Sequence, residues 1–402
     1  MKKQIIIVLI LTAFQATIHN LGHPVTPDLV HSLDIPDYMF GVFFAMMALG
    51  MMIASPFFGL LGDHHKKNRL IFFGLLIYSI GQIGFGFGTN SIIMVLFRLM
   101  SGLGVAGIVT LFVSYIIENS SPEHKTRNLA YYSALLTFFA GLGYKLGGFL
   151  NHYEPLFPYL HLDQYRNIFL LQGILNCFFA VAVLFFLKED HIEEVTKEKV
   201  GFFASFKHMK ELDRSFFLFL IAVTLASMAS INISKYLDVY FIDRGYTSDN
   251  LGSFVFVTGI VSLISSTIIV PIIKKLNRDL AVIILIQLVS GLIILFVFRQ
   301  NQFLLFMYSL FNIYVLLKAI YTPFEQSYLS TYAKGNTLGL LMGVRQSFVS
   351  IGMIVGPIVG GFLYDRAPLL VFDVSAILLF ISFIFLVLVY QVNKKKKAQL
   401  EN

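Results

Sequence analysis

Four basic side chains lie inside long apolar stretches of this 402-residue sequence: Arg98, Lys145, Lys235 and Lys318. A charge at membrane depth is costly, so such a residue usually faces a water-filled cavity or a partner of opposite charge. Arginine hardly deprotonates, but it can hold an anion or act on a neighbouring acid. These residue types therefore indicate charge recognition or an effect on a neighbouring acid, and for Arg98 a structural role with bonds to backbone carbonyls is the alternative.

Few acids accompany these bases. Glu325 follows Lys318 by seven residues, which places both on one face of a helix, just past Pro323. Glu325 is our first choice for a protonatable carboxylate, and a carboxylate exposed to water at the helix end is the alternative. Asp238 is a second candidate for proton coupling and follows Lys235 by three residues, so these two side chains could pair with each other.

The first apolar stretch carries a polar stripe. Gln15, His19, Gly22 or His23, and Thr26 recur at helical spacing, and a polar stripe on a membrane helix faces protein or water. Histidine titrates near neutral pH, so His19 is a candidate proton relay. A structural histidine held by a hydrogen bond is the alternative.

Tyrosines stand beside several of these polar residues. The predicted substrate cavity therefore includes Gln15 and Lys145 together with Tyr144, Lys235, Tyr236, Lys318 and Tyr321. Tyr314 stands near the same group.

The composition predicts which structural elements carry these residues. The sequence is 57% hydrophobic and 13% charged, with a mean hydropathy of +0.76. Apolar runs of about 20 residues are typical of transmembrane helices. We therefore predict an all-α integral membrane protein with twelve spans, at 4–29, 39–60, 70–88, 91–117, 128–150, 166–187, 215–241, 248–270, 280–299, 303–331, 338–363 and 370–391.

A polar segment from Lys188 to Arg214 divides six spans from six. It predicts an N-terminal half at 1–187, a cytoplasmic linker at 188–214 and a C-terminal half with a basic tail at 215–402. Most lysines and arginines then fall on one side of the membrane, which predicts that both termini are cytoplasmic.

Several classes of function are disfavoured. The single cysteine, Cys177, cannot form an intramolecular disulfide or a cysteine zinc site, and no P-loop, HExxH or Cys/His cluster occurs. We expect no enzyme activity, no cofactor and no metal. The net charge of +7 is concentrated in groups that flank apolar helices, as topology requires, so we expect no nucleic-acid binding.

Three motifs carry a resemblance to a known family. "GLLGDHHKKN" spans 59–68, "RLMSGLGVAG" spans 98–107 and "GPIVGG" spans 356–361. With twelve spans and a central charged linker, they resemble the major facilitator superfamily, and within it the twelve-helix bacterial drug–proton antiporters. The resemblance implies proton coupling at Arg98 and a cytoplasmic gate at Asp63, with Glu118 and Arg345 as candidate members of the same charge cluster.

The glycines of these motifs imply close helix packing and gating. They are Gly102 in the second motif, Gly143 and Gly147 in the fifth span, and Gly356, Pro357 and Gly360 in the eleventh. The antiporter pattern G-P-x-x-G-G is expected in the fifth span, where this sequence has Tyr144 in place of proline. The full pattern occurs only in the eleventh span.

The sequence thus predicts a monomeric multi-pass transporter of the bacterial cell membrane, surrounded by lipid. It would export a small amphipathic compound by alternating access in exchange for protons. The excess of buried bases favours, as an alternative, an anionic substrate or an anionic lipid that is flipped. A membrane receptor that transports nothing is the remaining alternative.

Overall fold

In the computed structural model, residues 3–152, 163–188, 214–332 and 338–401 are described, and they form helices joined by turns and short connections without any strand. Twelve helical segments in this part of the chain are long and apolar enough to cross a membrane. This confirms the predicted all-α class and the predicted number of spans. Residues 189–213, most of the expected linker, lie outside the described residues.

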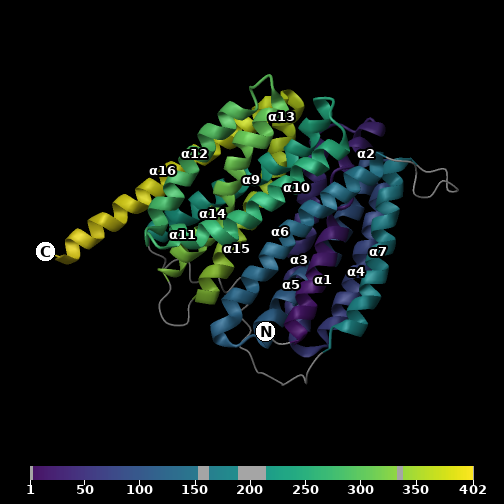
Figure 1. Ribbon diagram of the computed structural model, residues 1–402, viewed down its shortest axis with the longest axis horizontal. Helices are drawn as coiled ribbons and strands as arrows, with labels where there is room; N and C mark the ends of the chain where they lie inside the picture. The colour runs from purple at the N-terminus through teal and green to yellow at the C-terminus, as the bar shows by residue number, and fades with distance from the viewer. Residues whose placement is uncertain (1–2, 153–162, 189–213, 333–337, 402) are drawn as a thin grey trace. The chain divides into compact units, whose positions relative to one another are not determined.

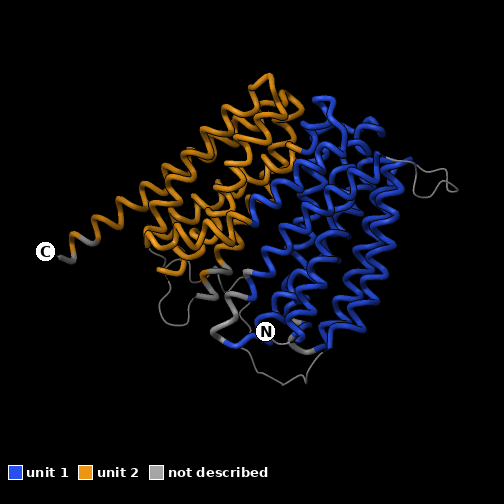
Figure 2. The backbone as a smooth tube through the Cα atoms, in the orientation of Figure 1, with its two compact units in different colours: residues 1–197, 238–263 blue, residues 198–237, 264–402 orange. Residues whose placement is uncertain are grey.

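The chain divides into two compact units, drawn in separate colours in Figure 2. Unit 1 comprises residues 1–197 and 238–263, and unit 2 comprises residues 198–237 and 264–402. Helix α9 (Arg214–Asp243) therefore runs from unit 2 into unit 1. These units have other bounds than the predicted halves at 1–187 and 215–402, and the division into those halves stays a prediction.

Unit 1 contains the helices labelled α1 to α7 and α10 in Figure 1. Their bounds are α1 Lys3–Asn20, α2 Thr26–Ser32, α3 Tyr38–His64, α4 Lys67–Phe87, α5 Ser91–Asn119, α6 Pro122–His152, α7 Gln164–Phe186 and α10 Ser248–Ile264. Helix α5 packs on α3 and α4, α4 packs on α7, and α1 packs on α6. Buried aliphatic side chains such as Leu75, Leu111 and Val183 form the core between these helices.

The first span is interrupted, which corrects the prediction of one helix over 4–29. Helix α1 ends at Asn20, residues 21–25 form a turn, and α2 begins at Thr26. Pro24 and Pro27 lack the backbone N–H that a continuous helix would use, and Pro27 is well placed in the first turn of α2. The predicted polar stripe is therefore split between α1 and the segment that follows it.

Unit 2 contains the remaining helices and the greater part of α9. The bounds are η3 Ser265–Ile269, α11 Val270–Lys274, α12 Asp279–Val297, α13 Phe303–Phe306, η4 Met307–Phe311, α14 Asn312–Ser330, α15 Leu338–Arg366 and α16 Pro368–Glu401. Two single turns, η3 and η4, are π-helical and interrupt spans that the sequence predicts as continuous. Such π-bulges are frequent at functional sites.

The eleventh-span motif packs against α9. The Tyr236 hydroxyl donates to the Pro357 carbonyl at 2.7 Å, and a Cβ added at Gly360 would lie 2.8 Å from both Asn232 and Tyr236. Tyr236 is fully buried at this contact. Gly360 thus lies at a close contact of α15 with α9. Tyr236 packs at this contact and is not among the residues that line the two cavities described below, so its place in a substrate cavity stays a prediction.

Candidate functional site

A buried carboxylate in unit 1 is hydrogen-bonded to a tyrosine. Asp238, in the last turns of α9, is 1% exposed and accepts a hydrogen bond from the Tyr144 hydroxyl of α6 at 3.0 Å. Tyr144 is itself buried. A carboxylate removed from water needs such a partner, because burying an unpaired charge is very costly.

Arg98 is a buried cation on α5 that is held mainly by aromatic contact. Its guanidinium carbon lies 3.6 Å from the centre of the Phe85 ring, and its Nη2 donates to the Thr26 hydroxyl at 3.4 Å. Within the described residues, no carboxylate lies at ion-pair distance from Arg98. Its charge therefore acts on its surroundings and is not cancelled in a pair.

Aromatic rings connect Tyr144 with the first span. The His23 ring stacks on the Tyr144 ring, with centroids 5.5 Å apart and planes 8° apart. His19 stacks on Tyr78 at 5.1 Å, and the centroids of the His19 and His23 rings are 5.9 Å apart. The two imidazoles thus lie in a row of rings that ends at the Tyr144 hydroxyl and Asp238.

A cavity of about 460 Å³ in unit 1 reaches this row. Its size lies in the ordinary range of small-molecule sites. The lining includes three of the predicted residues, Gln15, His19 and Tyr144. The other lining residues are Ala16, Asn20, Met51, Val105, Val109, Leu136, Thr137, Ala140, Gly141, Val255, Thr258, Gly259 and Ser262. Apart from His19, no lining residue is ionisable near neutral pH, which suits an uncharged or amphipathic body.

Lys145 lies outside the lining of this cavity, unlike its neighbour Tyr144. Its ammonium group pairs with Asp249 at 2.7 Å and donates to the Ser253 hydroxyl at 2.7 Å, both on α10. The excess of base that the sequence suggests is thus cancelled at this position. Lys145 joins α6 to α10 in place of the predicted substrate contact.

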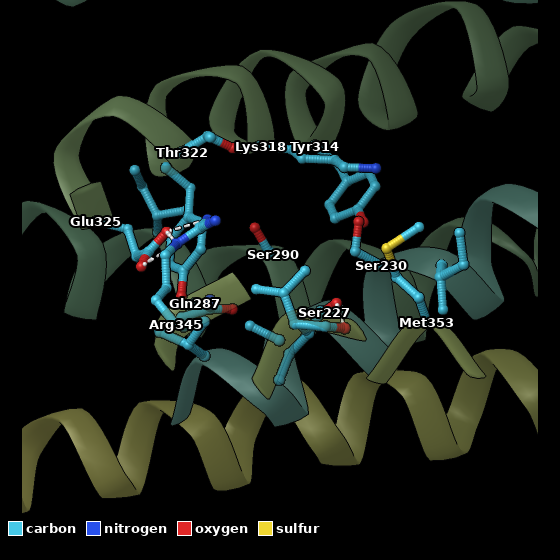
Figure 3. A pocket seen from close by; sticks show the side chains of 17 residues that line it. Ser227, Ser230, Gln287, Ser290, Tyr314, Lys318, Thr322, Glu325, Arg345 and Met353 are labelled. Carbon is cyan, nitrogen blue, oxygen red and sulfur yellow. Dashed lines mark hydrogen bonds and ion pairs between the residues drawn. The ribbon is translucent and has the colours of Figure 1, made fainter. Parts of the chain in front are cut away.

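Unit 2 has its own cavity of about 240 Å³ (Figure 3). Four predicted residues line it: Lys318, Tyr321, Glu325 and Arg345. The remaining lining residues are Val223, Ala226, Ser227, Ser230, Ile231, Ile286, Gln287, Ser290, Tyr314, Thr322, Val349, Met353 and Leu379. The predicted shared face of Lys318 and Glu325 is therefore the face of α14 that borders a cavity.

Glu325 is bound by two nitrogens of one guanidinium group. Arg345 Nε lies 2.9 Å and 3.0 Å from the two carboxylate oxygens, and its Nη2 also donates to Oε2. The Glu325 side chain is 0% exposed. A two-pronged pair of this kind fixes both partners in direction as well as in charge.

The charge cluster that the resemblance implies takes a different form. Arg345 has Glu325 as its carboxylate partner, while Glu118 pairs with Lys67 at 2.9 Å and accepts from the Ser114 hydroxyl. Asp63 lies near the end of α3, and its side chain lies outside the described residues. The gate role of Asp63 stays a prediction.

A second polar cluster surrounds α2, a short helix that lies outside the twelve candidate membrane spans. The Asn151 amide donates to Asp28 at 3.1 Å and to the Ser248 hydroxyl at 3.0 Å. Burial raises the pKa of Asp28 from 3.8 to about 6, against the lowering effect of His31 and of these hydrogen bonds. The His31 imidazole lies 3.2 Å from Asp37, and this hydrogen bond raises the pKa of His31.

The sequence analysis singled out several of the polar residues of these sites but not the residues that pair with them. Asp249 and Asn151 were not singled out, although Asp249 is the acid in the first turn of α10 and so stands out locally. Lys145 and Asp249 are 104 residues apart, and Tyr144 and Asp238 are 94 apart. Spacing within one helix carries no information on such pairs.

These features define a multi-pass membrane protein in which buried charges and polar groups border internal cavities within an all-helical fold. The family model described as "Major Facilitator Superfamily" matches residues 5–317 and 251–402. The chain belongs to the major facilitator superfamily, a family of membrane transporters, and is not an enzyme.

Two bacterial relatives are similar over most of the chain. Multidrug resistance protein 2 of Bacillus subtilis is 25% identical over 371 residues, with 90% of each chain covered. Quinolone resistance protein NorA of Staphylococcus aureus is 25% identical over 347 residues, with 85% of each covered. Both are bacterial, and the chain is a multi-pass protein of the bacterial cell membrane.

A solved structure has a similar fold. The bacterial homologue of the human lysosomal transporter Spinster, inward-facing and occupied, matches with a TM-score of 0.74 and 12% identity. The match covers 96% of each chain. At this identity the likeness concerns the fold alone.

Proposed function

We propose that this chain exports a small amphipathic compound across the bacterial cell membrane in exchange for protons. The family and the names of the two resistance proteins support this function. In the proposed mechanism, the halves 1–187 and 215–402 alternate access to a central site. We further propose that the protein acts as a monomer within the lipid bilayer and has both termini in the cytoplasm.

The hydrogen bond between Tyr144 and Asp238 carries this proposal. Asp238 is buried, and the Tyr144 ring forms part of the wall of the 460 Å³ cavity. A proton that reaches the cavity has a short route to the carboxylate past Tyr144. Proton binding at Asp238 would replace an anion by a neutral acid, which changes what the cavity wall can bind.

Arg98 would act on this carboxylate through its charge. Its positive charge interacts electrostatically with Tyr144, so the tyrosine lies under the influence of both Arg98 and Asp238. An uncancelled cation nearby stabilises the ionised state of the acid after the proton has left. The role therefore requires a permanent charge and not a titrating group, which suits arginine.

His19 fits a relay at the cavity wall. It lines the cavity and lies one ring away from His23, which stacks on Tyr144. Imidazole exchanges protons near neutral pH. In this proposal His19 passes the proton between the cavity and the Tyr144–Asp238 pair.

Glu325 fits a different role from the one expected first. Its charge is cancelled by Arg345 through several hydrogen bonds, so a proton could bind there only after the pair had opened. We therefore assign proton binding to Asp238. The Glu325–Arg345 pair would hold α14 against α15.

The test uses purified protein in liposomes with a pH gradient and norfloxacin, a fluorescent quinolone, as the probe. Asp238→Asn should lower gradient-driven norfloxacin flux at least roughly tenfold, because the amide cannot take up the coupling proton. Norfloxacin binding without a gradient should persist. Tyr144→Phe should lower the flux less, because it removes the hydrogen bond and leaves the acid.

Asp163→Asn is the matched control, because Asp163 is half exposed and pairs only locally with Arg166. It should transport as the wild type does. Full gradient-driven flux in Asp238→Asn would exclude Asp238 as the proton carrier. The absence of gradient-driven flux in the wild type over a broad panel of compounds would count against transport itself.

A further inference from the structure

The cavity in unit 2 contains a lysine with an unusual environment. Lys318 projects from α14 into the cavity, and its side chain is accessible there. Within the part of the chain that the structure describes, no carboxylate lies at ion-pair distance from it. A cation at membrane depth is normally compensated, so this position calls for a counter-charge from elsewhere.

The other charges around the cavity do not supply it. Glu325 is engaged by Arg345, and together they contribute no net charge. Lys235 lies near enough to Lys318 to interact with it electrostatically, and this interaction is repulsive. Among the ionisable residues that line the cavity, Lys318 therefore carries a positive charge that no other lining residue cancels.

Hydroxyl groups accompany the lysine. Figure 3 shows the Lys318 nitrogen on the side of the cavity where Tyr314 and Ser230 lie, away from the Glu325–Arg345 pair. Hydroxyl groups can donate to an anion or accept from an ammonium group. Beside the Lys318 ammonium group, these hydroxyls would donate hydrogen bonds to a bound anion.

The volume limits what enters. At about 240 Å³ the cavity is smaller than the roughly 300–1,000 Å³ typical of sites that enclose a whole drug-sized molecule. A cavity of this volume can enclose one small end of a ligand. The larger and nearly uncharged cavity of unit 1 has no comparable cation in its wall.

From these observations we infer that the unit 2 cavity binds a small anionic group, of the carboxylate type, on Lys318. The inference builds on the proposed export function by making this group the charged end of the exported compound. A cationic end would meet repulsion from Lys318. The substrates would thus be amphipathic acids or zwitterions, and not simple lipophilic cations.

The test compares three ligands that share one hydrophobic body: 4-phenylbutyrate, 4-phenylbutan-1-ol and 4-phenylbutan-1-amine. Binding is measured by calorimetry on the full chain in nanodiscs of neutral lipid, at pH 7 and without a gradient. The carboxylate should bind roughly 10- to 100-fold tighter than the alcohol, as expected for a hydrogen bond to a charged group. The amine should bind most weakly.

Variants of Lys318 test whether this residue causes the preference for the carboxylate. Lys318→Met shortens the unbranched side chain by one atom and removes its charge, so the affinity for 4-phenylbutyrate should fall to that for the alcohol. Lys318→Arg should retain the preference for the carboxylate. Lys145→Met is the matched control, since Lys145 is compensated by Asp249 and lies outside both cavities; it should leave all three affinities unchanged. If Lys318→Met does not purify, Lys318→Gln takes its place, and the ligand comparison in the wild type stands without any variant.

Anionic lipid is a second source of such a group. Nanodiscs containing phosphatidylglycerol should weaken 4-phenylbutyrate binding if lipid occupies the same site, which would support the anion site and name its occupant. Equal affinity for the carboxylate and the alcohol in the wild type, or an unchanged preference in Lys318→Met, would overturn the inference. Because binding is measured without a gradient, this result is independent of whether norfloxacin flux follows the pH gradient.

Discussion

At the scale of single residues, the buried carboxylates differ in the groups that compensate them. Cationic partners hold Glu325 and Asp249, whereas Asp28 accepts a hydrogen bond from the Asn151 amide and Asp238 accepts one from the Tyr144 hydroxyl. A neutral donor stabilises an anion less than a cation does. Asp28 is held in this way within the described residues, so a proton can exchange there without breaking a carboxylate–guanidinium or carboxylate–ammonium pair.

Asp28 gives a prediction for pH dependence. Burial raises its pKa from 3.8 to about 6, so the folded protein holds this proton more tightly than the unfolded chain does. Stability must therefore fall as pH rises from about 4 to about 6, where the unfolded chain has released the proton and the folded protein still binds it. Asp28→Asn should flatten this part of the curve and raise the melting temperature above pH 6.

The measurement is the melting temperature of purified protein in detergent between pH 4 and pH 7. His31, whose pKa is raised by its hydrogen bond to Asp37, contributes stability that is lost at higher pH, above about 6.5, and thus outside most of this window. Asp34→Asn is the control, because Asp34 is exposed in the same region of the chain. Parallel curves for Asp28→Asn and the wild type would show that Asp28 titrates normally.

The chemistry-bearing residues were largely predictable from the sequence, because a charge within an apolar run is visible without a structure. Arg98, Lys318 and Glu325 were singled out in this way, and Tyr144 was singled out as a neighbour of Lys145; each lies buried or at a cavity wall. Their partners were not predictable. Whether Lys145 faces a substrate or Asp249 depends on which helices become neighbours, and that is a property of the tertiary packing.

At the scale of elements, backbone contact holds α6 against α10. A Cβ added at Gly148 would lie 2.1 Å from the Ser248 carbonyl oxygen, and one at Gly252 would lie 2.5 Å from the Tyr144 carbonyl oxygen. Such distances exclude a methyl group unless the helices move apart. Small residues are the usual means by which membrane helices approach this closely. The same approach brings Lys145 to Asp249.

Gly148→Ala should therefore destabilise unit 1. Overpacking of this kind costs about 1–3 kcal/mol, so the melting temperature in detergent should fall by several degrees. Gly59→Ala is the matched control in α3, where the nearest side-chain atom to an added Cβ, Thr110 Cγ2, is 3.9 Å away. A melting temperature for Gly148→Ala equal to that of Gly59→Ala would mean that α6 and α10 are not held in contact.

The elements themselves follow from hydropathy with two exceptions. The turn at residues 21–25 and the π-helical segments η3 and η4 interrupt spans that have a continuous apolar pattern. Hydropathy measures how favourably a segment partitions into lipid. The turn at residues 21–25, which contains Pro24 and precedes Pro27, is apolar enough to be counted as part of a continuous span. The local hydrogen-bond pattern is set by neighbours, as in the bond from the Ser265 hydroxyl of η3 to the Leu316 carbonyl.

At the scale of the whole molecule, the distribution of lysine and arginine predicts the orientation in the membrane. Basic residues are retained on the cytoplasmic side of membrane proteins, and the segments richest in lysine are the predicted linker 188–214, with five, and the tail "NKKKK", with four. Both would then lie in the cytoplasm, together with the N-terminus. The connection between α12 and α13, at residues 298–302, would lie outside.

A chemical test of this orientation is direct, because Cys177 is the only cysteine. In a Cys177→Ser background, Asn301→Cys and Lys395→Cys each introduce one thiol at an exposed position. A membrane-impermeant maleimide should label Asn301→Cys in intact cells and leave Lys395→Cys unmodified until the membrane is opened. Inverted vesicles should give the reverse pattern, and unsubstituted Cys177→Ser should stay unlabelled in both. Labelling of Lys395→Cys in intact cells would place the basic tail outside, and the proposed direction of proton-coupled export would have to be reversed with it.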